Sequence, residues 1–203
     1  MAILKVARLG HPVLRRPARA PTTDELKGRA LQRLIDDMVE TMVDEDGIGL
    51  AAPQVHHSYR LLVLGDPEGD QDEPDAIPLT VLANPRIAAC ANDREWAWEG
   101  CLSLPGLRGL VPRSGHVLVE ATDRRGKPVR LEARGYLARV LQHEMDHLDG
   151  VVFVDRMPDL RRLAFNEEFA RYCAPAAQDS GAAAQPGPSP CPGPAAAAAG
   201  SAG

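Results

Sequence analysis

Two histidines and a glutamate lie close together in the segment HEMDH, residues 143–147. His143 and His147 are four residues apart, so in a helix both imidazoles lie on one face and can reach one metal ion. Glu144 follows the first histidine, where its carboxylate can reach a water on that ion without binding the ion itself. The alternative is two solvated histidines on an exposed helix. The apolar residues around the segment favour a buried helix, and buried histidines need partners, so we favour a metal centre with Glu144 as the general base.

A catalytic metal site of this kind usually has three protein ligands. No histidine follows His147, and the later glutamates, Glu167 and Glu168, lie in a segment with the pattern of a surface helix. The best candidate is therefore upstream, at Cys101, which follows a glycine at the end of a strand-like stretch. The alternative is that Cys101 is a small buried hydrophobic residue. One cysteine and two histidines would suit Fe(II), Co, Ni or Zn better than Mg or Ca.

The segment GIGLAAPQ, residues 47–54, is a third candidate for chemistry because it is rich in glycine and alanine. Such residues let a backbone approach a ligand closely, and Gln54 adds an amide donor. The simpler alternative is a glycine-rich turn that ends a helix. Taken alone, the segment favours the glycine-rich turn. A role in chemistry becomes the better interpretation only in combination with the motifs around Cys101 and His143.

Three helices should position these residues. The first runs from a capping box at Thr22 and Glu25 to Gly47. The other two are expected at 135–148, which carries the two histidines, and at 159–173.

Alternating or short apolar runs predict strands at 60–65, at 81–89 and in a hairpin over 115–134. Residues 1–21 should form an ordered arm, and 66–78 an exposed acidic excursion. We expect an α+β fold, with short antiparallel strands and hairpins packed around a central metal-binding helix, an N-terminal helix and a C-terminal helix. Residues 1–173 would form one catalytic domain. Residues 174–203 are a low-complexity Ala/Gly/Pro tail that should be disordered, because it cannot bury enough apolar surface to fold.

In this order, GIGLAAPQ, EGCLS and QHEMDH resemble the motifs of the peptide deformylase family, over about Val6 to Met157. The resemblance implies that Cys101, His143 and His147 bind one metal ion. In this family the ion is usually Fe(II), with Zn, Ni or Co as possible substitutes. It also implies that the ion's water attacks a formyl group, that Glu144 is the general base and acid, and that Gln54 and the backbone N–H of Leu102 stabilise the oxyanion.

Further roles follow from the same resemblance. The backbone of Gly49 would bind the main chain of the substrate, and Ile48, Tyr136 and Val140 would line an apolar pocket for methionine. Arg108 would reach main-chain carbonyls of the substrate; a solvated loop arginine is an equal alternative. Outside these roles, we expect Glu99 and Arg113 to form an ion pair behind the Cys101 loop, and Asp146 to be structural.

The implied activity is removal of the formyl group from the N-terminal formyl-methionine of new polypeptides, near the ribosome, with release of formate. A peptidase of the HExxH type that cleaves internal bonds is the first alternative, but it needs a ligand downstream of His147, which is missing. A metal-stabilised binding module is the second, and it would not need Glu144.

Composition narrows the setting of this activity. The net charge is -5, and no run of Lys or Arg stands out, which disfavours a nucleic-acid substrate. The N-terminus has no apolar signal region, and no stretch approaches the 18 apolar residues of a membrane span. The four cysteines lack paired spacing, which disfavours a disulfide framework. We therefore expect a cytoplasmic protein.

Overall fold

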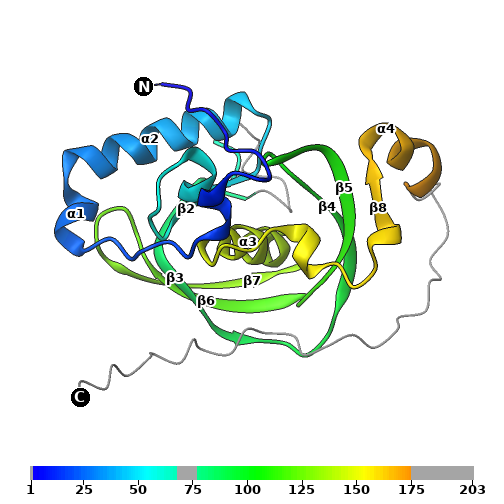
Figure 1. Ribbon diagram of the computed structural model, residues 1–203. Helices are drawn as coiled ribbons and strands as arrows, with labels where there is room; N and C mark the ends of the chain where they lie inside the picture. The colour runs from blue at the N-terminus through cyan, green and yellow to red at the C-terminus, as the bar shows by residue number, and fades with distance from the viewer. Residues whose placement is uncertain (1, 68–76, 175–203) are drawn as a thin grey trace, which may run out of the picture.

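The computed structural model describes residues 2–67 and 77–174, which form two antiparallel sheets around a central helix (Figure 1). The larger sheet has the order β1-β2-β3-β6-β7, with β1 (Gly49–Ala51), β2 (Leu61–Leu64), β3 (Thr80–Cys90), β6 (His116–Thr122) and β7 (Pro128–Arg134). The smaller sheet has the order β4-β5-β8, with β4 (Glu95–Cys101), β5 (Leu104–Arg113) and β8 (Leu163–Phe165). The expected α+β class is confirmed, as are the strands predicted near 60–65 and 81–89 and the hairpin β6–β7.

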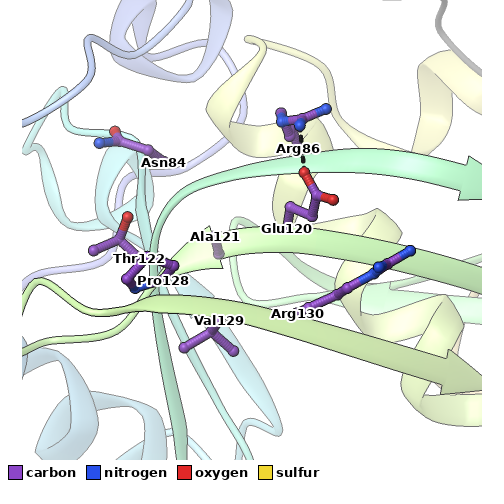
Figure 2. Close-up of a pocket in the computed structure, with 8 residues that line it drawn as sticks. All are labelled: Asn84, Arg86, Glu120, Ala121, Thr122, Pro128, Val129 and Arg130. Carbon is purple, nitrogen blue, oxygen red and sulfur yellow. Dashed lines mark hydrogen bonds and ion pairs between the residues drawn. The ribbon is translucent and has the colours of Figure 1, made fainter.

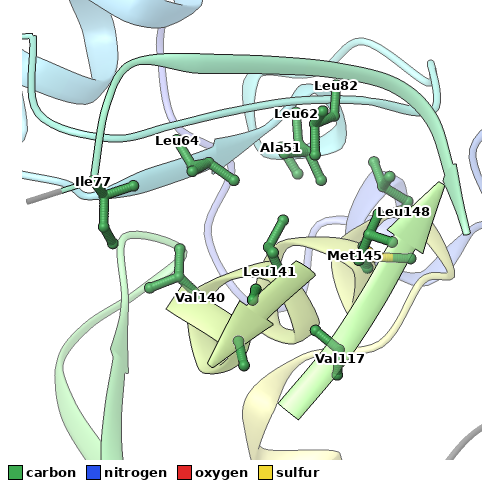
Figure 3. Packing of buried hydrophobic residues seen from close by; sticks show 13 residues of the cluster. Ala51, Leu62, Leu64, Ile77, Leu82, Val117, Val140, Leu141, Met145 and Leu148 are labelled. Atoms are coloured by element: carbon green, nitrogen blue, oxygen red, sulfur yellow. The ribbon is translucent and has the colours of Figure 1, made fainter. Parts of the chain in front are cut away.

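The central helix is α3 (Gly135–Leu148), with the bounds that its apolar spacing predicts. It ends before Gly150, whose φ of 75° belongs to the left-handed region that glycine adopts easily. Val140, Leu141, Met145 and Leu148 of α3 pack against buried residues of the larger sheet (Figure 3). The helix that carries the histidines is therefore held by the main hydrophobic core.

Strand β2 is buried on both faces, and its side chains belong alternately to two hydrophobic clusters. Leu62 and Leu64 face α3, whereas Leu61 and Val63 face the helices on the other side of the sheet. These helices are α1 (Thr23–Lys27) and α2 (Arg29–Asp44). A third cluster lies under the smaller sheet, around Phe153.

The N-terminal helix differs in one detail from the prediction. The capping box between Thr22 and Glu25 is present. The helix is not continuous, however, because Gly28 adopts an extended conformation, with φ −68° and ψ 146°, and separates α1 from α2. Residues 2–21 form the expected arm, with one 3-10 turn, η1 (Pro12–Arg15).

The prediction of a helix over 159–173 is wrong in its first half. That half contains a 3-10 turn, η4 (Leu160–Arg162), and strand β8, in which Leu163, Ala164 and Phe165 pair with β5. Helical structure follows only in α4 (Asn166–Glu168) and in the π-helical turn η5 (Phe169–Cys173). The expected C-terminal helix is thus reduced to residues 166–173.

The loop expected in GIGLAAPQ is also more regular than predicted. It contains β1 and the 3-10 turn η2 (Ala52–Val55). Another 3-10 turn, η3 (Phe153–Arg156), follows α3. Because β1 pairs with β2 and η2 contacts α3, the segment is built into the core of the fold.

The tail after Ala174 and most of 66–78 lie outside the described residues. Within the described ranges, no helix combines the length and apolar character that a membrane span requires. Cys101 and Cys173 are free thiols, whereas Cys90 is disulfide-bonded, a bond that the spacing of the cysteines did not predict.

Candidate metal centre

Four side chains converge where α3 meets the end of β4. His143, Glu144 and His147 of α3 are all buried, with 9%, 4% and 0% of their surface exposed. Cys101, the last residue of β4, is half-buried and faces them. The site therefore joins the smaller sheet, which carries the thiol, to the helix that packs on the larger sheet.

The three candidate ligand atoms are close enough to share one ion. One atom each of Cys101, His143 and His147 lies within 4.8 Å of the other two. The Cys101 Sγ and the His147 Nε2 are 3.2 Å apart, and the two imidazole rings have centroids 5.1 Å apart at an angle of 73°. One sulfur and two imidazole nitrogens form a donor set that fits a divalent transition metal.

The carboxylate of Glu99 holds the first histidine from behind. Its Oε2 lies 2.9 Å from the His143 Nδ1, which leaves Nε2 of that ring for the ligand position. Arg113 donates to the same carboxylate from Nε and Nη2, at 2.9 and 3.0 Å. The expected ion pair of Glu99 and Arg113 is thus present, and it contacts a histidine directly. Asp146 has the structural role expected of it, since it accepts from Arg113 and Arg156.

Burial and contacts shift the pKa values of these groups in different directions. Burial lowers the pKa of His147 well below its usual value, which favours the neutral imidazole that metals bind. Burial also disfavours the charged form of His143, but hydrogen bonds to Cys101 and Glu99 outweigh it and raise the pKa. For Glu99, burial alone would raise the pKa, yet the contacts with His143 and Arg113 hold it well below its usual range.

Glu144 lies against β1. A Cβ atom on Gly49 would come within 2.6 Å of the Glu144 Oε1, so only a glycine leaves room for this carboxylate. The Glu144 Oε2 is buried and has no hydrogen-bond partner among the described residues. Burial raises the pKa of Glu144 to about 7. This carboxylate is therefore positioned beside the ligand group and is free to accept a hydrogen bond.

Gln54 is fixed so that its amide nitrogen points toward the thiol. Its Oε1 accepts from the backbone N–H of Ala51 at 2.8 Å, which determines the orientation of the amide. Its Nε2 then lies 3.6 Å from the Cys101 Sγ and 3.4 Å from the Ser103 Oγ. In the sequence Leu102 lies between Cys101 and Ser103, and its side chain packs against the hydrophobic cluster beneath α2. Gln54, Leu102 and Cys101 therefore come together.

The other predicted residues are divided between the core and the surface. Ile48 and Val140 belong to the cluster around α3, where Val140 is buried and Ile48 partly so. Tyr136, in the first turn of α3, is 59% exposed. Arg108 pairs in register with Gly100, next to Cys101, and its guanidinium lies 5.4 Å from the centre of the Phe169 ring.

A separate cavity of about 410 Å³ lies on strands β3, β6 and β7, away from the ligand group (Figure 2). The residues that line it are Asn84, Arg86, Glu120, Ala121, Thr122, Pro128, Val129 and Arg130. Arg86 and Glu120 form an ion pair with each other there. None of the residues predicted for chemistry lines this cavity.

Sequence analysis missed three polar residues of the site: Ser103, Arg139 and Arg156. Ser103 and Arg139 are buried, and Arg139 donates to Glu99. Two of them carried a signal in the sequence. Ser103 ends the EGCLS motif, and Arg139 precedes His143 by four residues and so shares its helix face.

Comparisons with known proteins agree on one family. The family model described as polypeptide deformylase matches residues 3–163. Peptide deformylase 1 of Bordetella pertussis is 43% identical over 164 residues, which cover 80% of this chain and 92% of the relative. The crystal structure of the peptide deformylase from Thermotoga maritima, 37% identical, has a TM-score of 0.70, with 78% of this chain and all of that chain covered. A Met-Ala-Ser-bound class I type b peptide deformylase from Acinetobacter baumannii, 36% identical, has a TM-score of 0.71, with 77% and 99% covered.

Proposed function

Because this chain belongs to the peptide deformylase family, and is a hydrolase, we propose that it removes the formyl group from the N-terminal formyl-methionine of new polypeptides. The products are formate and a free amino terminus. The observation that carries the proposal is the group Cys101, His143 and His147, with its ligand atoms within 4.8 Å and Glu144 next to it. The relative with bound Met-Ala-Ser supports a substrate of this class.

The proposed cofactor is one divalent ion, Fe(II) in the cell, with Ni, Co or Zn as substitutes. Cys101, His143 and His147 would hold it, since a thiolate and two neutral imidazoles suit these ions and leave a position for water. When bound, the ion supplies an activated water and withdraws electron density from the formyl carbonyl.

The residues of the chain perform the other steps. Glu144 takes a proton from the attacking water and returns it to the leaving amine as the bond between the formyl carbon and nitrogen breaks. Gln54 Nε2 and the backbone N–H of Leu102 donate to the formyl oxygen while it gains negative charge. Such donors contribute about 3–4 kcal/mol each in other acyl-transfer enzymes. The hydrogen bond from Ala51 to Gln54 supports this role, because it aims the amide nitrogen toward the metal position.

We propose that the substrate extends along β1, with its main chain at Gly49 and the methionine side chain between Ile48 and the face of α3 that carries Tyr136 and Val140. The placement of Ile48 and Val140 in one cluster supports an apolar pocket there. Arg108 would bind main-chain carbonyls, which its position opposite Gly100 supports. We expect the protein to act in the cytoplasm, on chains that emerge from the ribosome, with residues 1–173 as the catalytic domain.

The decisive experiment compares formyl-Met-Ala-Ser with acetyl-Met-Ala-Ser, using protein loaded with iron or nickel. We expect formate from the first peptide and no cleavage of the second. Equal cleavage of both, or cleavage between Met and Ala, would contradict a deformylase and favour an internal peptidase. Cys101→Ala serves as the control, since it should lose the metal and the activity together.

A further inference from the structure

Arg139 is buried, with 7% of its surface exposed, and has no part in the proposed reaction. It makes three hydrogen bonds, two to strand β4 and one to strand β5. It donates from Nη1 to the Glu99 Oε1 at 2.8 Å and to the Val111 carbonyl at 2.9 Å. From Nη2 it donates to the Glu95 carbonyl at 2.6 Å. One guanidinium of α3 thus contacts the start of β4, the last part of β5 and the carboxylate that holds His143.

The contacts of Glu99 connect Arg139 to the metal centre. Its Oε1 accepts hydrogen bonds from Arg113 and Arg139, and its Oε2 accepts hydrogen bonds from Arg113 and from Nδ1 of His143. The position of Oε2 therefore depends on the donors at Oε1, because the carboxylate turns as a rigid plane. With Oε2 fixed, the His143 ring is held with Nδ1 toward Glu99 and Nε2 toward the other ligands.

The two hydrogen bonds from Arg139 to backbone carbonyls concern the strand that carries Cys101. Cys101 is the last residue of β4, and Glu95 is the first. By bonding to Glu95 and to Val111 of the paired strand β5, Arg139 ties this hairpin to the helix that bears both histidines. The single side chain thus links both sources of ligands.

We propose that Arg139 is a positioning residue, which acts through Glu99 to orient His143 and through β4 to place Cys101 for metal binding. The inference rests on the metal centre of the proposed function, but it concerns metal affinity and ligand geometry, which are measured without the reaction.

The test is a titration of the metal-free protein with cobalt(II) in competition with a chelator, without oxygen, together with the visible spectrum of the cobalt protein. For Arg139→Gln we expect the affinity for cobalt to fall by about 10- to 100-fold, the range for residues that orient metal ligands. We also expect shifts in the cobalt bands, because the ligand geometry changes. Native affinity together with a native spectrum would overturn the proposal.

Arg60→Gln is the matched control, because it removes a comparable set of hydrogen bonds that should support only the stability of the fold. Arg60 also donates to one carboxylate, that of Asp149 at 2.6 Å, and to two carbonyls, those of Leu148 and Pro85 at 3.4 Å. Unlike the Glu99 carboxylate, the side-chain carboxylate of Asp149 makes no hydrogen bond to the side chain of a ligand residue within the described ranges. Arg60→Gln should therefore lower thermal stability while it leaves the cobalt affinity and spectrum unchanged. An equal loss of affinity in both variants would show that Arg139 has only a structural role.

A double-mutant cycle tests whether Arg139 acts through Glu99. In a Glu99→Gln background, Arg139→Gln should weaken cobalt binding much less than it does in the native protein. Equal effects in the two backgrounds would refute the route through Glu99. If Arg139→Gln does not fold, Arg139→Lys replaces it with the same expected and contrary outcomes, since lysine keeps the charge but lacks the planar pair of nitrogens with which Arg139 reaches its partners. Native protein that binds cobalt but fails to deformylate would contradict only the proposed function.

Discussion

Glu144 and Cys101 lie in the same small centre, but the proposed roles separate metal binding from proton transfer. We predict that Glu144→Ala keeps about the native metal content and loses at least about 100-fold in kcat, the usual size of a general-base effect. Cys101→Ala should lose metal as well as activity. Metal analysis and kcat of both purified variants test this. Full turnover by Glu144→Ala, or full metal content in Cys101→Ala, would contradict the assignment.

Gln54 uses its two amide atoms differently, which permits a sharper substitution than alanine. Gln54→Glu keeps an oxygen for the Ala51 N–H and removes the amide donor. We predict a fall of about 100-fold in kcat, with a smaller change in KM, because the donor acts mainly on the charge of the transition state. Metal content and circular dichroism should stay native. A change confined to KM would show that Gln54 binds the ground state instead.

The three candidate metal ligands and the pair of Glu99 and Arg113 could be predicted, but the other partners around the centre could not. The spacing of His143 and His147 implies a shared ion, because four residues make one helical turn. The contact between Arg139 and Glu99 spans 40 residues of sequence. Such pairings arise only when the helix and the strands have packed. The chain order alone gives no reason to choose Glu99 over another acid as the partner of Arg139.

At the scale of elements, the contact between β1 and α3 determines where Glu144 lies. Gly49 has no positive φ, so alanine fits its backbone, but the added Cβ would meet the Glu144 carboxylate at 2.6 Å. We predict that Gly49→Ala folds and binds metal, while kcat/KM falls by at least about 10-fold because Glu144 must move. Thermal unfolding, metal content and kinetics check this. Native kinetics would show that Glu144 can shift without loss.

Helices and strands were predicted correctly where the local sequence pattern determines them. Helix α3 has the expected bounds because its apolar residues recur at helical spacing on one buried face. The failure at 163–165 has the opposite cause: these residues pair with β5, and pairing with a distant strand overrides a helical pattern. Strand β1 was expected to be a loop, because its three residues carry no strand pattern of their own and become regular only by pairing with β2.

At the scale of the whole molecule, the centre connects two parts of the fold that have separate cores. Cys101 belongs to the smaller sheet and its cluster, whereas α3 packs against the larger sheet. Buried charges cross the same boundary, since Arg113 of β5 pairs with Asp146 of α3. A bound ion would add a further link at this boundary, and the stability of the fold should therefore depend on it.

We therefore predict that removal of the metal lowers the unfolding temperature. An ion at about 1,000 times its dissociation constant stabilises the native state by about 4 kcal/mol if it does not bind the unfolded chain. For a protein of this size, 1 kcal/mol corresponds to about 2–4 °C, so the shift should be about 8 °C or more. Calorimetry of nickel-loaded and chelator-treated protein measures it. Cys101→Ala supplies the control, because without the thiol the ion no longer joins β4 to α3 and nickel should shift its unfolding temperature far less. Equal shifts in both proteins would mean that the ion stabilises α3 alone and that Cys101 is not a ligand.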